Sequence, residues 1–369
     1  MTPSPPFAGR AARRRSTRRR SLLLAGGLVA AALVAVGALT GLRGAGGRTS
    51  GASPAAAGSP SGRPPASPTA SPSPSPPPYV PPRIAPVIRP ALAGEGVWHR
   101  AVRWVPGGSP MRLAWYRPDP ADPAALAYVA WIDTTRTHLA LYPGWNNPAP
   151  GIPGPRTEEV PMRVRPRLLA TFNSGFYLQG PPGFEPGLTI PGGFAVNGVT
   201  YTPFVKGLAT VVAYTDGRVN VIAWWGGRTP GKDVVMARQN FPLIVRNGRP
   251  TPALSVSEAW GSTLAGAPAV WRTALGVDAH GDLVYVAASQ QTAPSLAQIM
   301  IHIGAVRAMQ LDINTIWPIF VVFKRPGAGV PSMFVPNPSQ IPTRFLNPSQ
   351  KDFFAVYLAR TTTYRKEPF

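Results

Sequence analysis

The sequence predicts an α+β protein in which a largely antiparallel mixed sheet packs against a few helices, preceded by a transmembrane helix and a disordered Pro-rich linker. Three observations predict this class. Short apolar runs recur from residue 95 onward between Asp-Gly and Asn-Gly turns, which is the pattern of antiparallel hairpins. A later segment has the apolar spacing of one helix face. The first 94 residues contain no acidic side chain and include a long uncharged stretch.

The first 94 residues divide into three predicted parts. Residues 1–20 form a basic cytoplasmic segment with seven Arg between Arg10 and Arg20. Residues 21–42 are uncharged and long enough to cross about 30 Å of hydrocarbon, which indicates a membrane anchor or a cleaved signal sequence. We expect the single-pass anchor, and the positive flank then puts the rest of the chain on the extracytoplasmic side. Residues 43–94 are a Pro-, Ser- and Ala-rich linker whose composition cannot bury a core.

The residues from 95 to 369 are expected to form one domain rich in strands. Asn-Gly turns at Asn197 and Asn247, and turns led by or containing Asp at 133–136, 215–218 and 278–281, predict hairpins between neighbouring apolar runs. The expected strands cover residues 111–116, 127–132, 138–142, 168–172, 194–196, 199–201, 209–214, 219–225, 243–246, 273–277, 283–288 and 308–311.

One helix is expected near residues 295–303. Ser295 is a suitable N-cap, and apolar residues at 296, 299, 300 and 303 fall on one face. Gly304 ends the helix, because glycine readily takes the left-handed conformation that follows a helix. The strand expected at 308–311 then leads to Asp312.

The composition excludes several classes of protein. The absence of Cys excludes disulfides, thiol nucleophiles and cysteine metal sites, and the four His lie far apart in sequence, so we expect no metal and no cofactor. The net charge of +22 divides into 12 Arg before residue 95 and a balance of +10 after it. Because that later part has no basic run with interleaved aromatics, nucleic-acid binding ranks last and we expect no nucleic-acid partner.

Two short stretches carry candidate binding residues. Asn173 ends an apolar run and precedes Gly175 and Phe176; its amide can donate and accept, and the glycine lets a ligand approach the backbone. The alternative for Asn173 is an Asx turn that only ends the strand. Arg272 begins an apolar run, where its guanidinium needs a carboxylate or phosphate partner; a surface position or an internal ion pair is the alternative.

Two carboxylates are candidates for acid–base chemistry. Asp312 ends a buried run, and partial loss of water raises a carboxyl pKa toward the range of a catalytic acid. Hydrogen bonding to nearby backbone amides is the alternative for Asp312. Asp278 lies at a hairpin turn, and turn chemistry alone accounts for an Asp there. Glu185 and Glu258 are further acids in Gly- and Pro-containing loops.

In their order and spacing, these stretches resemble the phosphodiester glycosidase family. The family's Asn-x-Gly-Phe-Phe/Tyr element is matched from Asn173, and its strand with an Asn-Gly turn is matched by residues 241–248. An Arg-Thr-Ala-x-Gly-x-Asp-x-x-Gly element is matched by residues 272–281, and Gly-Ala-x-x-Ala-x-x-Leu-Asp by residues 304–312.

Together with the N-terminal segment, the resemblance implies an extracytoplasmic hydrolase of phosphodiester-linked sugars in envelope glycans. It implies that Asp312 acts as the acid/base, Arg272 holds the phosphate and Asn173 holds the substrate. A two-carboxylate scheme needs a second acid, for which Asp278 and Glu258 are the candidates. The implied partner is a sugar phosphodiester or an envelope polysaccharide.

The sequence departs from the family directly after Asp312. The family usually continues with Gly-Gly-Gly-Ser, which suits backbone contacts to a phosphate or sugar oxygen, whereas this chain has Ile-Asn-Thr-Ile-Trp-Pro at 313–318. Side chains of Asn314 and Thr315 would replace backbone donors, and Trp317 would stack on a sugar ring. Candidate substrate-binding residues are therefore Asn173, Gly175, Phe176, Asn314 and Trp317. The alternative function is a non-catalytic cell-surface glycan-binding domain of the same fold.

Overall fold

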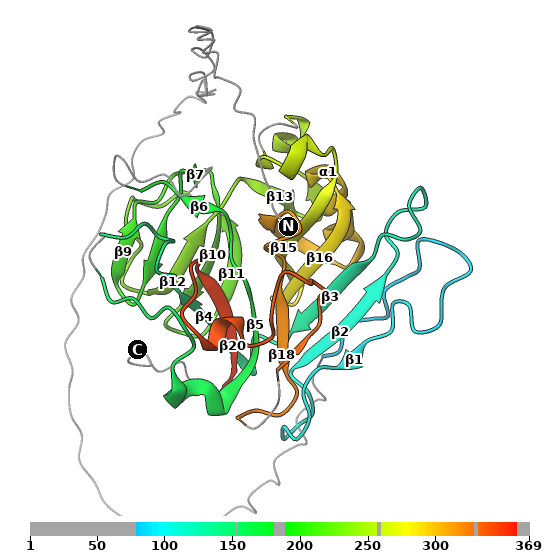
Figure 1. The fold of residues 1–369 in the computed structure, drawn as a ribbon, viewed down its shortest axis with the longest axis horizontal. Coiled ribbons are helices and arrows are strands. Elements are labelled where there is room, and N and C mark those ends of the chain that lie inside the picture. Colours follow the sequence, from blue (N-terminus) through cyan, green and yellow to red (C-terminus); the bar gives the residue numbers. More distant parts are fainter. Residues whose placement is uncertain (1–78, 152–153, 181–188, 257–259, 328–330, 360–369) are drawn as a thin grey trace, which may run out of the picture. The chain divides into compact units, whose positions relative to one another are not determined.

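The computed structural model describes residues 79–151, 154–180, 189–256, 260–327 and 331–359 (Figure 1). The expected basic segment, the membrane anchor or signal at 21–42, and most of the linker lie outside these residues. Within the described ranges, no helix is both long and apolar enough to cross a membrane. The expected strand-rich part can be followed from residue 95 to residue 359 with short gaps.

Three antiparallel sheets and one short parallel pair make up the fold. The eight-stranded sheet has the order β1 (His99–Arg100), β2 (Met111–Tyr116), β3 (Ala127–Ile132), β16 (Leu283–Gln291), β15 (Val270–Asp278), β17 (Ala305–Ile313), β13 (Leu243–Arg246) and β14 (Arg249–Pro250). The β5 sheet has the order β19 (Pro331–Met333), β18 (Phe320–Phe323), β5 (Leu168–Asn173), β20 (Phe353–Leu358) and β4 (Thr137–Tyr142). The β10 sheet has the order β11 (Val219–Ala223), β10 (Ala209–Tyr214), β12 (Val234–Gln239), β8 (Phe194–Val196) and β9 (Val199–Thr202), and β6 (Tyr177–Leu178) pairs in parallel with β7 (Thr189–Ile190).

The expected helix is present as α1 (Ala293–His302), which covers one face of the eight-stranded sheet. It begins earlier than predicted, because Thr292 is the N-cap and Ser295 forms the reciprocal half of a capping box. Gly304 follows the helix with φ of 92°, as expected. The other face of the large sheet packs its apolar side chains against the β5 and β10 sheets.

The prediction of an α+β protein with a few packed helices is wrong. Among the described residues, α1 is the only α-helix, and the remaining helical turns are short 3₁₀ segments: η1 (Met162–Arg167), η2 (Pro252–Ser255), η4 (Leu264–Gly266) and η5 (Arg344–Leu346). The structure is therefore mostly β. Proline removes an amide donor and glycine raises the entropic cost of ordering a helix, and the chain contains 48 Pro and 38 Gly.

Most of the predicted hairpins are confirmed, and one is wrong. β8 pairs with β9, β10 with β11, β13 with β14 and β15 with β16, each across the predicted turn. The turn at 133–136 also forms, with Asp133 accepting a hydrogen bond from the Thr135 amide. However, β3 pairs with β2 and β16, whereas β4 pairs with β20 in a different sheet. Turn chemistry bends the chain there without fixing which strand becomes the partner.

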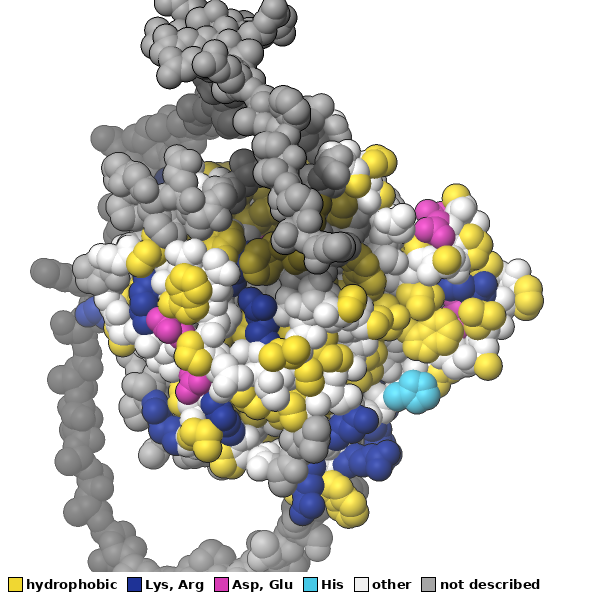
Figure 2. All heavy atoms as spheres, viewed as in Figure 1, with side chains coloured by type: hydrophobic (Ala, Val, Ile, Leu, Met, Phe, Trp, Pro, Cys, Tyr) yellow, Lys and Arg dark blue, Asp and Glu magenta, His cyan; other side chains and the backbone are white. Residues whose placement is uncertain are grey.

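The surface is basic on the face shown in Figure 2, where Lys and Arg side chains gather in several groups and acidic side chains are few. This agrees with the positive balance that the sequence has after residue 95. A surface of this kind favours contact with anionic ligands.

Candidate functional site

Asp312 lies where the three sheets meet. Its backbone amide donates to Ser174 O, directly after β5, and its carbonyl accepts from Thr273 Oγ1 of β15. Arg272 pairs with Ile313 and Ala274 pairs with Gln310, so one extra residue is inserted into β17 at this point. Such a bulge bends a strand and redirects its side chains. The direction of the Asp312 side chain is therefore set by a β-bulge near the end of β17.

The Asp312 carboxylate forms a buried ion pair with Lys351. Lys351 Nζ donates to Asp312 Oδ2 over 2.5 Å, and both side chains are about 95% buried. Burial raises the pKa of Asp312 to about 6, although Lys351 and, further away, Arg238 pull it down. Burial lowers the pKa of Lys351. A carboxyl group that titrates near 6 is suited to proton transfer near neutral pH.

A second buried ion pair supports the first. Arg238 on β12 donates to Asp352 over 3.0 Å, and Asn147 Nδ2 donates to the same carboxylate over 2.5 Å. Arg238 and Asn147 also donate to the carbonyl oxygen of Phe176. The negative charge of Asp352 raises the pKa of Asp312, because two carboxylates close together disfavour ionisation.

Aromatic and cationic side chains form the outer layer of this cluster. The Lys351 ammonium lies 4.6 Å from the ring centroid of Tyr177 and 4.3 Å from that of Trp317, within cation–π range. Arg344 lies over Trp317 at 6.0 Å, and both are half-buried. The hydroxyls of Tyr177 and Ser174 are buried without a hydrogen-bond partner among the described residues. Unsatisfied buried polar atoms are rare, and here they flank Asp312.

The structure places Asn173 beside Asp312 but occupies its amide with protein partners. Asn173 Oδ1 accepts from Tyr285 Oη and the Ile319 amide, and Nδ2 donates to Thr273 Oγ1 and Ser174 O. Its side chain thus joins β5, β15 and β16. This arrangement supports a structural role in aligning the strands.

Gly175 and Phe176 shape the floor of the cluster. A Cβ atom at Gly175 would lie 2.8 Å from Asn240 Oδ1 and 3.1 Å from Arg238 Nη1, so the close approach is to protein groups. The Phe176 ring packs edge-on against Phe241 at 4.9 Å between centroids. Both residues contact Arg238 of the second ion pair, Gly175 through its close approach and Phe176 through its carbonyl oxygen.

Arg272 is buried and meets neutral acceptors in place of the carboxylate or phosphate that we predicted. Its Nε donates to Gln291 O, and its Nη1 donates to Trp260 O and Gln310 Oε1. Burial lowers its pKa to about 10. Its side chain contacts Gln291, Trp260 and Gln310, whereas the Asp312 carboxylate pairs with Lys351, so the two side chains share no hydrogen-bond partner among the described residues.

Asp278 lies at the far end of β15. It pairs with Ala305, seven residues before Asp312 on β17, which corresponds to about 20 Å along the sheet. Its carboxylate accepts hydrogen bonds from the amides of His280 and Asp282 and from the Trp131 indole. These are the contacts of a hairpin turn. The other nominated acids, Glu185 and Glu258, lie outside the described residues.

With the geometry in place, the chain can be compared with known proteins. Residues 167–312 match the phosphodiester glycosidase family. The resemblance predicted from the sequence is confirmed. The phosphodiester glycosidase match begins just before β5 and ends at Asp312 itself, so Lys351 and the divergent segment at 313–318 lie beyond it. A comparison with curated protein sequences gives no match.

Several solved structures are similar to parts of this chain. One is the catalytic domain of zebrafish N-acetylglucosamine-1-phosphodiester alpha-N-acetylglucosaminidase, auto-inhibited by its pro-peptide, at 16% identity over 72% of this chain and 88% of that chain, with a TM-score of 0.42. A hypothetical protein from Synechocystis is 12% identical over 69% of this chain and 63% of that chain, with a TM-score of 0.39. A putative exported protein from Burkholderia pseudomallei is 16% identical over 64% of this chain and 74% of that chain, with a TM-score of 0.34.

The segment that departs from the phosphodiester glycosidase pattern is ordered by its own side chains. Asn314 takes φ of 73°, a conformation that Asn tolerates better than most residues. Its Oδ1 accepts from the Leu264 amide and its Nδ2 donates to Ser262 O, so the side chain binds a neighbouring loop. Trp317 lies in the cluster around Lys351, as described above.

Sequence reasoning missed Lys351, Asp352, Arg238, Tyr177 and Arg344. A signal for two of them exists, since Lys351 and Asp352 stand directly before the wholly apolar strand β20. Adjacent charges at the start of a buried strand need partners. Arg238 gave a similar sequence signal, because it directly follows the apolar run Val-Val-Met-Ala. In the structure it lies inside β12 and is 1% exposed.

Proposed function

We propose that this protein hydrolyses phosphodiester-linked sugars of envelope glycans on the extracytoplasmic side, with Asp312 as the general acid. The observation that carries the proposal is the buried Asp312 carboxyl with a pKa of about 6, set among cations at the end of the segment that matches the phosphodiester glycosidases. The family match supports a glycosidase type of reaction. The extracytoplasmic location rests on the sequence of residues 1–42 alone.

In the proposed reaction, protonated Asp312 gives its proton to the phosphate oxygen that leaves the sugar. The bond between the anomeric carbon and that oxygen breaks, and water adds to the anomeric carbon. The products are the free sugar and a phosphomonoester. One proton of the water stays on the new sugar hydroxyl, and the other goes to a base that is not assigned among the described residues, for which Glu258 stays a prediction. That base releases the proton to solvent, from which Asp312 takes up a proton before the next turnover.

The cations near Asp312 suit the charge of the leaving phosphate. Lys351 pairs with Asp312 in the free protein and would transfer its interaction to the phosphate as Asp312 takes up a proton. Arg344 is half-buried over Trp317 and supplies a guanidinium fork from the outer side. We assign phosphate binding to these two residues, and Trp317 to contact with the sugar.

The test is release of sugar from UDP-sugars and from synthetic glycosyl phosphodiesters. General acid catalysis contributes on the order of 10²- to 10⁴-fold, so Asp312→Asn should lose activity by about that factor. The matched control is Asp278→Asn, which removes a turn carboxylate far along the same sheet and should retain turnover in its folded fraction. Full turnover by folded Asp312→Asn would contradict the assignment.

A second function is favoured by one specific observation. Lys351 Nζ forms an ion pair with the Asp312 carboxylate at 2.5 Å, and Ile313, Asn314 and Thr315 replace the glycines of the phosphodiester glycosidase loop. A non-catalytic glycan-binding domain would keep such a closed ion pair. Saturable binding of envelope polysaccharide, with no product after prolonged incubation of wild-type protein, would support binding over hydrolysis.

A further inference from the structure

Phe241 of the motif at residues 241–248 packs against Phe176 of the Asp312 cluster, whereas the other end of the motif builds a separate charged feature. β13 ends in Arg246, a tight turn follows at Asn247 and Gly248 with positive φ at both residues, and β14 begins with Arg249. This is the geometry of a two-residue hairpin, which sets the residues before and after the turn opposite each other. The turn therefore places two arginines side by side at the edge of the eight-stranded sheet.

The strand register extends this pair to a row. Arg249 on β14 pairs with Arg246 on β13, and Arg246 pairs with Arg307 on β17. Residues directly opposite in antiparallel strands project from the same face, and neighbouring strands lie about 4.8 Å apart. We call Arg249, Arg246 and Arg307 the arginine row.

The two outer arginines have no counter-charge. Arg246 and Arg249 are exposed, and neither guanidinium group has a hydrogen-bond or ion-pair partner among the described residues. Arg307 is half-buried and donates to Val221 O and Asn220 Oδ1, both neutral acceptors. The positive charge of the row is therefore not neutralised within the described part of the chain.

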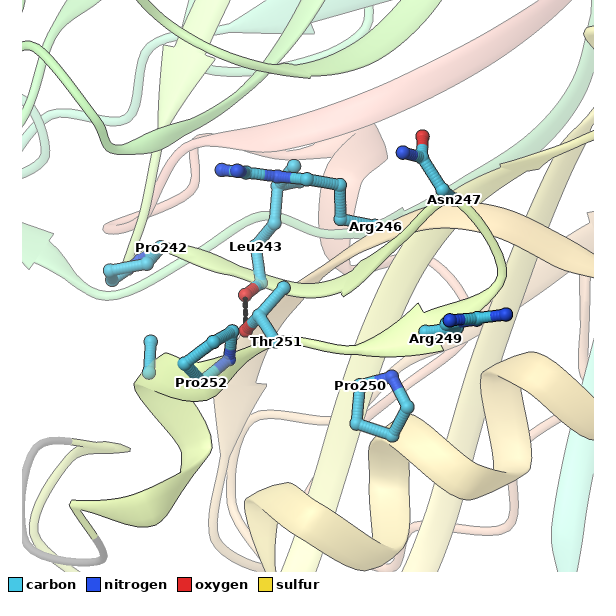
Figure 3. A pocket seen from close by; sticks show the side chains of 9 residues that line it. Pro242, Leu243, Arg246, Asn247, Arg249, Pro250, Thr251 and Pro252 are labelled. Atoms are coloured by element: carbon cyan, nitrogen blue, oxygen red, sulfur yellow. Dashed lines mark hydrogen bonds between the residues drawn. The ribbon is translucent and has the colours of Figure 1, made fainter.

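A cavity of about 510 Å³ lies against the hairpin (Figure 3). It is lined by both outer arginines, by Asn247, and by Thr251 and several prolines, and none of the described lining residues is acidic or aromatic. Thr251 Oγ1 donates to Leu243 O and so fixes the base of the hairpin. In Figure 3 the guanidinium groups of Arg246 and Arg249 extend in opposite directions, so they face two separate anionic groups better than one.

We infer that the arginine row and its cavity bind a ligand that carries more than one phosphate group, such as a sugar–phosphate polymer. Guanidinium forks match phosphate oxygens, and the volume lies within the usual range of about 300–1,000 Å³ for ligand sites. The described lining residues include no aromatic side chain, which disfavours nucleic acid, whose bases stack on such rings.

The site is separate from Asp312. Leu243 in the cavity lining pairs with Met309, three residues before Asp312 on β17, which corresponds to about 10 Å. The inference goes beyond the proposed function, because binding at the row requires no turnover and is measured without it. If the proposed function and this inference both hold, a polymer bound at the arginine row is a substrate that also contacts the Asp312 cluster.

The test uses the full chain and an arginine-specific reagent, phenylglyoxal, with modification measured at each arginine by mass spectrometry. Inorganic polyphosphate, at a free concentration of about ten times its Kd, should slow modification of Arg246 and Arg249 by about tenfold, because only the roughly one tenth of the protein without bound polyphosphate then reacts. Arg228, an exposed arginine between β11 and β12, is the control in the same molecule and should be unaffected. Residue-resolved detection separates the row from the basic N-terminal segment.

The outcomes are distinguishable. Protection at the row by polyphosphate but not by inorganic phosphate at equal phosphorus concentration supports the inference. Equal protection by both overturns it in favour of a site for a single phosphate group. Equal protection of Arg228 and the row, or no protection at all, overturns the inference. Stronger protection by a single-stranded oligonucleotide than by polyphosphate overturns it in favour of nucleic acid.

A variant pair gives a second, independent readout. Arg246→Gln/Arg249→Gln should weaken pyrophosphate binding by about tenfold in titration calorimetry. Arg228→Gln/Lys232→Gln removes the same formal charge from another loop and should leave it unchanged. An equal loss in both double variants would show a general effect of net charge and would contradict the inference.

Discussion

Lys351 Nζ lies 2.5 Å from Asp312 Oδ2, although Lys351 stands two residues before β20 and Asp312 near the end of β17 in a different sheet. The pair therefore ties the eight-stranded sheet to the β5 sheet. Taking two charges out of water costs free energy that their attraction must offset. The pair is therefore better explained by what it does to the Asp312 proton than by a gain in stability.

Removing one partner of this pair should be costly. Lys351→Met leaves a buried carboxylate unpaired, and we expect the free energy of unfolding to fall by about 3–5 kcal/mol in urea titrations. The double variant Lys351→Met/Asp312→Leu should recover most of the loss, because neither charge then remains buried. Arg218→Met, which breaks the exposed pair with Asp216, is the control and should change little. An effect of Lys351→Met no larger than this control would contradict the buried pair.

Stability should depend on pH through Asp312. Its folded-state pKa is raised to about 6 from 3.8, so the folded protein keeps this proton where the unfolded chain has lost it. The resulting contribution is fully present below about pH 4 and is lost as the pH rises through 6, with a total of about 3 kcal/mol.

Asp312→Asn should remove this part of the slope of unfolding free energy between pH 4 and pH 6. Asp282, whose pKa burial also raises to about 6, contributes separately, and Asp282→Asn provides the comparison. Identical slopes in wild type and Asp312→Asn would show that the Asp312 pKa is not raised.

Substitution of Arg272 should lower the stability of the fold, whereas substitution of Arg344 should weaken substrate binding. Arg272→Gln leaves two backbone carbonyls and Gln310 without their donor, and we expect a loss of about 1–3 kcal/mol in unfolding free energy with KM unchanged in the folded fraction. Arg344→Gln should raise KM for a glycosyl phosphodiester and leave stability nearly unchanged. The reverse pattern would restore Arg272 as the phosphate ligand.

Gly175 should tolerate no side chain. In Gly175→Ala the new Cβ would lie 2.8 Å from Asn240 Oδ1 and 3.1 Å from Arg238 Nη1, so the buried ion pair must shift. Overpacking of this kind costs about 1–3 kcal/mol, which thermal unfolding would detect. Gly198→Ala is not constrained by neighbouring atoms and measures the cost of positive φ alone. A loss at Gly175 smaller than at Gly198 would mean that the floor of the cluster is not tightly packed.

The sequence was sufficient to locate most strands, because their apolar runs and Asn-Gly turns are local signals. β2, β3, β8, β10 and β13 have the predicted bounds. Which sheet a strand joins is a long-range property, and for that reason the hairpin expected at 133–136 was wrong. The further packed helices that the fold class implied are absent from the described residues, where α1 is the one α-helix.

The candidate site was predictable in part for the same reason. Asp312, Asn173 and Trp317 each lie at the end of, or just after, an apolar strand, where a polar or aromatic residue stands out in sequence. Lys351 reaches Asp312 through the pairing of β20 with β5, and Asp312 lies within the bulge of β17 between Gln310 and Ile313. Neither the pairing nor the bulge leaves a local mark in the sequence.

The pH dependence of kcat/KM for a synthetic glycosyl phosphodiester tests the central claim most directly. If Asp312 is the general acid, wild-type kcat/KM falls as the pH rises through about 6, the pKa of that carboxyl. Asp312→Asn is then slower by about 10²-fold or more and loses this limb of the profile. A folded Asp312→Asn variant with the wild-type rate and the same limb near pH 6 would contradict the account.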